Sequence, residues 1–176
     1  MKTLNKIFFT LTILWMIVIY IFSSQSGDTS ASISGGLTEA IISTIIRDYD
    51  SYSPDKQLYI LETTHFLIRK AAHFTEYAIL GILSCLTLLT HSCSNNMLYI
   101  ASNIKDKMTK IISISLIFSS IYAISDEIHQ RFTENRSPAV ADIILDSSGA
   151  LTGILVISLL FYIFHLKKNL IKDNTK

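Results

Sequence analysis

Four long, largely apolar stretches lie at residues 4–24, 71–90, 111–130 and 143–165. Each is close to the roughly 20 residues that an α-helix needs to cross about 30 Å of hydrocarbon. A helix is the expected conformation of such a stretch, because it pairs its own backbone groups where no water can do so. The pattern predicts an all-α polytopic membrane protein, a bundle of four transmembrane helices. We expect one domain over residues 1–170 and a short cytoplasmic tail at 171–176.

The long connection between the first and second stretches carries a helical pattern of its own. Apolar positions recur there at helical spacing, at Ile33, Leu37, Ala40, Ile41 and Ile45. This pattern predicts an amphipathic outer segment that lies along the membrane surface. Ser53 followed by Pro54 is typical of a helix cap and a first helical position. We expect a second helix to begin there and to continue through Thr64 into the second span.

The first stretch has one alternative interpretation, as a signal peptide. Lys2 and Lys6 precede it, and the small residues Ser24 and Ser26 follow it. Its apolar part is longer than the core of a usual signal peptide, which favours a retained span.

Composition supports a membrane protein and excludes some partners. Hydrophobic residues make up 49% of the 176 positions and charged residues only 16%, whereas a soluble domain carries about a quarter. The net charge of +1 does not suit a protein that binds nucleic acid by bulk attraction, so we expect no nucleic-acid partner. Cys85 and Cys93 would lie about 12 Å apart along a helix, too far for a disulfide.

The basic residues are unevenly divided between the two sides of the predicted spans. One side holds nine: Lys2, Lys6, Lys105, Lys107, Lys110, Lys167, Lys168, Lys172 and Lys176. The other side holds six, spread over many more residues: Arg47, Lys56, Arg69, Lys70, Arg131 and Arg136. Because cytoplasmic loops carry the excess of lysine and arginine, we expect both termini to face the cytoplasm.

With this orientation, the unusual polar residues all fall at the outer ends of the helices. On the second span, Arg69, His73 and Glu76 follow at offsets of four and three and share one face. Glu76 then lies about 10 Å deeper than Arg69. An ionised carboxylate at such a depth costs several kcal/mol unless it is paired or hydrated, about 3 kcal/mol on insertion scales. Glu76 therefore needs a partner.

The third span ends in a second polar string. Asp126 shares a helical face with His129 and Gln130, whereas Glu127 points about 100° away. We expect one of the two acids to serve the bundle and the other to face an aqueous mouth.

The fourth span opens with further acids. Ser137 and Pro138 are typical of a cap and a first helical position, which puts Asp142 near the positive end of the helix dipole. Polar and small positions continue along one face, at Asp142, Asp146, Gly149 and Gly153. The two glycines form a small-xxx-small strip that allows close helix packing.

Together these residues predict a ligand site of undefined chemistry. The candidate ligand-binding residues are Arg69, Lys70, His73, Glu76, Asp126, Glu127, His129, Gln130, Arg136, Asp142 and Asp146. Carboxylates and imidazoles can hold a divalent cation, and arginines can bind an anionic headgroup or a pyrophosphate. The spacing matches no zinc motif. If the protein is an enzyme, the catalytic candidates are Glu76, Asp126, His129, Asp142 and Asp146.

The polar strings resemble those of the VanZ-like family, small bacterial membrane proteins related to an accessory protein of teicoplanin resistance. The matching strings are Phe22-Ser23-Ser24-Gln25-Ser26, Arg69-Lys70-x-x-His73-Phe74-x-Glu76-Tyr77, Ser125-Asp126-Glu127-x-His129-Gln130 and Asp142-x-x-x-Asp146-x-x-Gly149. The family often has proline and glycine before the arginine that matches Arg136, whereas this chain has Thr133-Glu134-Asn135. Asn135 can adopt the left-handed conformation that a glycine would supply there.

The resemblance implies a four-helix domain in the bacterial cytoplasmic membrane and a link to envelope lipids or glycopeptide tolerance, but no reaction. Three functions remain open. The protein can bind an anionic lipid or a lipid-linked wall precursor, with Arg69 and Arg136 gripping the anion. It can be an intramembrane, metal-assisted hydrolase or transferase acting on a lipid-linked phosphate. Finally, its charges can serve only to lock the bundle, with partner proteins bound elsewhere.

Overall fold

The computed structural model describes residues 2–94, 104–133 and 139–173. Within these ranges, the side chains of residues 27–34, 93–94, 104–105 and 166–173 are not described. Over these residues the protein is all-helical, which confirms the predicted fold class. The elements in chain order are α1 (Lys2–Ser23), α2 (Gly27–Ile45), the short 3₁₀ helix η1 (Tyr49–Ser51), α3 (Pro54–Ser94), α4 (Ile104–Gln130) and α5 (Val140–Asp173).

Four of the helices are long and apolar enough to cross a membrane, as predicted. The candidate spans are Lys2–Ser23, Pro54–Ser92, Asp106–Gln130 and Val140–His165. Large apolar side chains point outward along all four, among them Phe9, Phe66, Ile121 and Leu159. Such an exposed apolar surface is unfavourable in water and suits a lipid environment. The chain is therefore a membrane protein.

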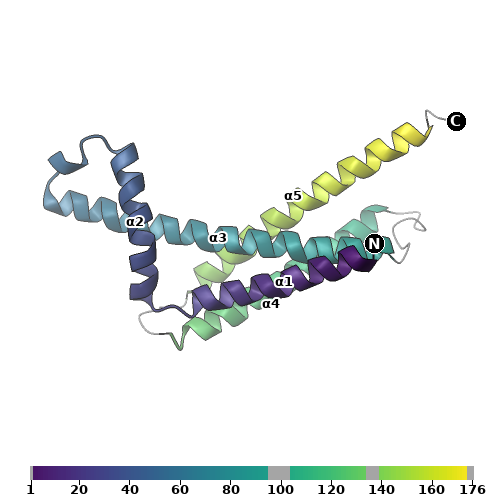
Figure 1. Ribbon diagram of the computed structural model, residues 1–176, viewed down its shortest axis with the longest axis horizontal. Helices are drawn as coiled ribbons and strands as arrows, with labels where there is room; N and C mark the ends of the chain where they lie inside the picture. Colours follow the sequence, from purple (N-terminus) through teal and green to yellow (C-terminus); the bar gives the residue numbers. More distant parts are fainter. Residues whose placement is uncertain (1, 95–103, 134–138, 174–176) are drawn as a thin grey trace.

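Helix α3 is the central element of the bundle. It packs against α5 over the largest interface and also contacts α1, α4 and α2. Consecutive spanning helices run in opposite directions, so the N-terminus and the C-terminal end of α5 lie at the same end of the molecule (Figure 1). Near that end, the C-terminal half of α5 diverges from the other helices.

The predicted outer segment is helical, and it lies across α3 (Figure 1). Thr38 and Ile42 of α2 are buried where the two helices pack. Helix α3 begins at Pro54, as predicted, and continues without interruption into the bundle. The Gln57 side-chain amide donates to the backbone carbonyls of Tyr49 (3.1 Å) and Tyr52 (3.2 Å). These bonds fasten η1 to the start of α3.

The interior of the bundle contains two apolar clusters. Ile19, Tyr77, Leu80, Ala123 and Ala150 form one of them. Cys85, Leu89, Met108, Ile111 and Ile154 form the other, closer to the end that carries the chain termini. Cys85 is a free, buried thiol that packs as a small apolar residue.

Glycines hold α3 and α5 close together. A Cβ atom at Gly149 would collide with the carbonyl oxygen of Phe74, and one at Gly153 with the carbonyl oxygen of Ala78. From the other side, a Cβ at Gly81 would collide with the carbonyl oxygen of Ala150. The two backbones therefore touch along this strip, as is usual for small residues between membrane helices.

Candidate functional site

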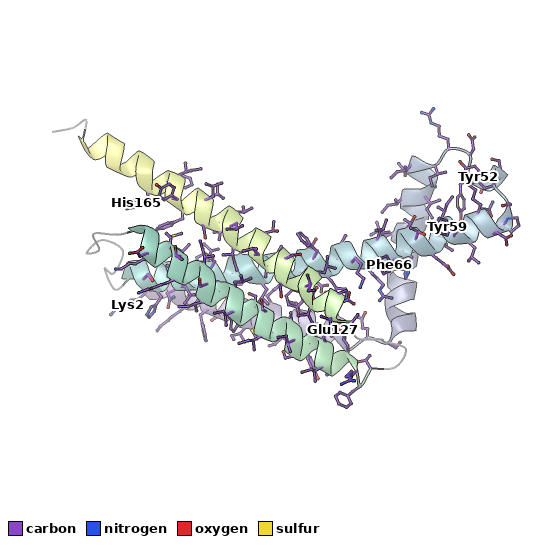
Figure 2. All side chains as sticks on the ribbon, turned by 180° about the vertical axis from the view of Figure 1, so that it is seen from behind. Lys2, Tyr52, Tyr59, Phe66, Glu127 and His165 are labelled. Atoms are coloured by element: carbon purple, nitrogen blue, oxygen red, sulfur yellow. The ribbon has the colours of Figure 1, made fainter. Side chains whose placement is uncertain are left out.

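The polar residues from four helices meet at the end of the bundle opposite the chain termini. This polar end comprises the C-terminal ends of α1 and α4, the middle of α3 and the N-terminal end of α5 (Figure 1). Figure 2 labels Glu127 there, whereas Lys2 and His165 lie at the opposite end. We call the described candidates the polar cluster: Arg69, Lys70, His73, Glu76, Asp126, Glu127, His129, Gln130, Asp142 and Asp146.

An ion pair joins α3 to α5 within the polar cluster. The Lys70 ammonium donates to a carboxylate oxygen of Asp142, and each side chain keeps about a quarter of its surface exposed. Asp142 lies in the first turn of α5, where the helix dipole favours a negative charge. The Lys70 ammonium also lies 5.2 Å from the centre of the Phe66 ring. Lys70 is thus held in place by an acid and an aromatic ring.

The face of α3 predicted to be polar turns toward the bundle. His73 Nδ1 lies 3.9 Å from a carboxylate oxygen of Glu76, one turn away. The backbone carbonyl of Glu76 accepts a hydrogen bond from the indole of Trp15 (2.9 Å), which ties α1 to this part of α3. The Nε atom of Arg69 is buried and has no hydrogen-bond partner among the described residues.

The two adjacent acids near the end of α4 are buried, and they face different neighbours. Asp126 is 4% exposed and accepts a hydrogen bond from the Gln130 amide (3.2 Å). The hydroxyls of Ser23 and Tyr77 lie beside Asp126 but make no hydrogen bond with described residues in their present positions. Asp126 therefore faces α1 and α3, inside the bundle.

Glu127 is turned toward the start of α5. It is 5% exposed and lies near the backbone of Ala139 and the side chains of Lys70 and Asp142. One of its carboxylate oxygens is buried without a hydrogen-bond partner in the described part of the chain. The two adjacent acids thus serve different helix pairs.

Asp146 lies one turn deeper along α5 than Asp142. It is 3% exposed, and one of its oxygens has no hydrogen-bond partner among the residues that the structure describes. Four other acids act on it electrostatically, namely Glu76, Asp126, Glu127 and Asp142. Negative charges repel one another strongly in a medium of low dielectric constant. The cluster therefore favours a neighbouring cation or hydrogen-bond donor.

His129 makes a different contact from the one that its helical position suggests. Its Nε2 atom lies 3.0 Å from the hydroxyl of Ser24, and its ring packs against Tyr20 with the ring centres 4.6 Å apart. It is thus held mainly by α1, although it shares a face with Asp126. Arg136, the remaining candidate, lies outside the described residues.

Several supporting residues were not among the predicted site residues. Tyr77 is fully buried beside Asp126, and Tyr122 donates from its hydroxyl to the Met16 carbonyl (2.6 Å). The Trp15 indole donates a hydrogen bond to the backbone carbonyl of Glu76. These are large, mainly apolar side chains within spans, so their patterns indicate packing rather than a polar contact. At the end of α1, the serines of the Phe22–Ser26 string were the signal visible in the sequence.

The polar cluster does not assemble a metal site within the described part of the chain. No group of three histidine, cysteine, aspartate or glutamate side chains there lies close enough to hold an ion. The acids instead form separate contacts with Lys70, Gln130 and His73.

A cavity of about 270 Å³ opens between α4 and α5 at the polar end. We call it the lateral groove, and its lining includes Ile124, Glu127, Ile128, Arg131, Val140 and Ile143. A second cavity, of about 280 Å³, lies between α2, η1 and α3 and is lined in part by Glu39, Ser43, Arg47 and Asp50. Of these two cavities, the lateral groove is the one that includes a member of the polar cluster, Glu127.

Comparison with known proteins gives one match. A family model described as VanZ/LLP1 matches residues 8–162, which include the second and third spans, most of the first and fourth, and the whole polar cluster. No curated protein matches the chain, and no solved structure does. Since the matched region covers most of the chain, this protein belongs to the VanZ/LLP1 family.

Proposed function

We propose that this protein works at the outer face of the bacterial cytoplasmic membrane. There its polar cluster recognises the headgroup of an envelope lipid or of a lipid-linked wall precursor. The lysine and arginine distribution supports this orientation, since it favours a cytoplasmic position for both termini. Both chain ends lie at one end of the bundle and the polar cluster lies at the other.

One observation carries the proposal: three buried polar atoms of the cluster have no hydrogen-bond partner among the described residues. They are Arg69 Nε, one oxygen of Glu127 and one oxygen of Asp146. A buried polar group left unpaired costs about 1–3 kcal/mol, and native proteins keep few of them. A headgroup that carries hydroxyl or ammonium donors together with phosphate acceptors is complementary to these three atoms. Ligand recognition therefore accounts for features that packing does not.

The Lys70–Asp142 pair favours the structural alternative, in which the charges only lock the bundle. A lock would be most stable with every buried charge paired. Among the described residues, this pair and the Gln130–Asp126 bond satisfy only part of the cluster. We therefore place the lock second. A metal-assisted hydrolase or transferase comes third, since the described side chains form no three-ligand group.

The anion-binding residues differ in how they fit the proposal. Arg69 is partly buried with an unpartnered Nε, so it is the strongest anion-binding candidate. Lys70 is already engaged by Asp142. Arg136 lies outside the described residues and keeps its predicted role. Binding of a wall precursor would also give a physical route to glycopeptide tolerance, which family membership suggests.

The test compares lipids retained by the wild-type protein and by the Asp146→Asn and Arg69→Gln variants. Each protein is purified in mild detergent, and its bound lipids are measured by native mass spectrometry. We expect retention of envelope lipids to fall roughly tenfold in both variants, which corresponds to about 1.4 kcal/mol. Gly35→Ala on α2 is the control, since nothing lies within 4 Å of the added methyl group. If both variants unfold at the wild-type temperature and retain the same lipids as wild type, the proposal is wrong.

A further inference from the structure

The lateral groove combines an apolar wall with two opposite charges. Ile124, Ile128 and Val140 line it and are exposed on the outward surface of α4 and α5. Both helices are candidate spans, so this wall faces the hydrocarbon of the bilayer. A groove of about 270 Å³ matches part of one acyl chain in size and chemistry.

The two charged residues of the groove, Glu127 and Arg131, are about one helical turn apart. Glu127 lies within α4, whereas Arg131 directly follows the last residue of that helix, Gln130. Glu127 is buried, and one of its oxygens has no hydrogen-bond partner in the described part of the chain. Arg131 is exposed, and the two side chains form no ion pair with each other. The acid is therefore deeper in the groove and the base is nearer its mouth.

We infer that the lateral groove binds a phospholipid whose headgroup carries a primary ammonium. Its phosphate is held by the Arg131 guanidinium, its ammonium donates to the free oxygen of Glu127, and one acyl chain lies against the isoleucines of α4. Arginine binds phosphate through several donors at once, and a carboxylate accepts charged hydrogen bonds. This inference rests on the proposed function and specifies the lipid class and its point of entry.

The charge pattern distinguishes this headgroup from the common alternatives. A trimethylammonium group has no N–H to donate, so a choline lipid leaves the Glu127 oxygen unpaired. A glycerol headgroup offers hydroxyl donors but no positive charge, so it cannot pair with Glu127 as a cation does. A primary ammonium supplies both the donors and the charge that this acidic neighbourhood favours.

The experiment measures binding of three lipids with identical acyl chains and with ethanolamine, choline or glycerol headgroups. Purified full-length protein is titrated with each lipid in detergent and examined by native mass spectrometry. We expect the ethanolamine lipid to bind roughly tenfold more tightly than the choline lipid, because it can form one additional charge-assisted hydrogen bond. Glu127→Gln should remove this preference by weakening ethanolamine-lipid binding to the level of the choline lipid. Arg131→Gln should weaken binding of all three lipids to a similar extent, because all three carry the phosphate.

Two further variants complete the test. Ile128→Trp fills the groove without changing a charge, so it should weaken all three lipids even if Glu127→Gln does not fold. Lys110→Gln, an exposed basic residue near the other end of α4, is the control for charge alone and should bind as wild type does.

The inference is overturned if the wild type shows no preference, if it prefers the glycerol lipid, or if Ile128→Trp binds normally. The proposed function is judged separately. If Asp146→Asn and Arg69→Gln still lose envelope lipids while the ethanolamine preference is absent, the polar cluster binds lipid by another route and only the groove assignment fails.

Discussion

Lys70 and Asp142 are the residues that most directly connect two helices through charge. Their ion pair links α3 with α5, and both side chains are mostly removed from solvent. Breaking such a pair leaves one charge without a partner in a medium that solvates it poorly. The same pair can also belong to a ligand site, because Glu127 and Asp146 lie close to it. A charge reversal separates the two roles.

We predict that Lys70→Asp and Asp142→Lys each lower the free energy of unfolding by about 1–3 kcal/mol, less than a fully buried pair would. The double reversal should recover more than half of the combined loss. Thermal unfolding in detergent measures this coupling. If the pair belongs to a ligand site, the double variant should regain stability but not lipid retention. Recovery of both would favour the structural lock instead.

At the scale of elements, the close approach of the α3 and α5 backbones depends on glycines. A methyl group at Gly153 would meet the backbone of α3, which cannot yield as a flexible side chain can. The polar cluster lies on the same two helices, so their separation also sets the distance between Lys70 and Asp142. The spacing of the site is therefore controlled by packing beneath it.

We predict that Gly153→Ala lowers the free energy of unfolding by about 1–3 kcal/mol, the usual cost of overpacking. It should also weaken lipid retention, although residue 153 is not part of the polar cluster. Gly36→Ala in α2 is the matched control, because its methyl group would meet nothing within 4 Å. That control should be neutral or stabilising by up to about 1 kcal/mol, since alanine favours a helix over glycine. Equal stability of the two variants would contradict the close helix contact.

At the scale of the whole molecule, the fold separates two very different ends. One end carries the chain termini, and the other carries the polar cluster, α2 and the outer part of α3 (Figure 1). Figure 2 shows Tyr59 and Phe66 along that outer part and Tyr52 just before it, all well away from Lys2 and His165. The proposed orientation assigns the first end to the cytoplasm.

We predict that a cysteine replacing Asp50 reacts with a membrane-impermeant maleimide in intact cells. A cysteine replacing Lys2 should react only after the membrane is opened. Both positions are exposed, so access to the reagent and not burial decides the outcome. The background carries Cys85→Ala and Cys93→Ser, and the unsubstituted background should remain unlabelled. The reverse labelling pattern would show that the polar cluster faces the cytoplasm.

The sequence predicts much of the fold because lipid imposes simple rules on the chain. A span must be long, apolar and helical, and those properties are visible in the four stretches. The start of α3 at Pro54 follows from local cap chemistry in the same way. The crossing of α2 over α3 is not visible, because it depends on where Thr38 and Ile42 find a partner.

Helical spacing predicts which polar residues share a helix end, but not how they pair. Helical spacing places His129 on the face of Asp126, yet His129 meets Ser24 and Tyr20, while Gln130 meets Asp126. The pairings depend on how each helix is rotated about its axis. In a mostly apolar span, both faces of the helix are apolar, so the sequence does not reveal that rotation. Tyr77 was overlooked for the same reason.

The unbroken length of α3 has a mechanical consequence. Its 41 residues span about 60 Å at 1.5 Å per residue. Tyr59 near one end and Glu76 farther along therefore belong to the same stiff rod, with no proline or loop between them to absorb a tilt. A partner that displaces the outer part of the rod must also displace His73 and Glu76 against α1 and α5. The outer part of α3 is thus mechanically coupled to the part of the polar cluster that this helix carries.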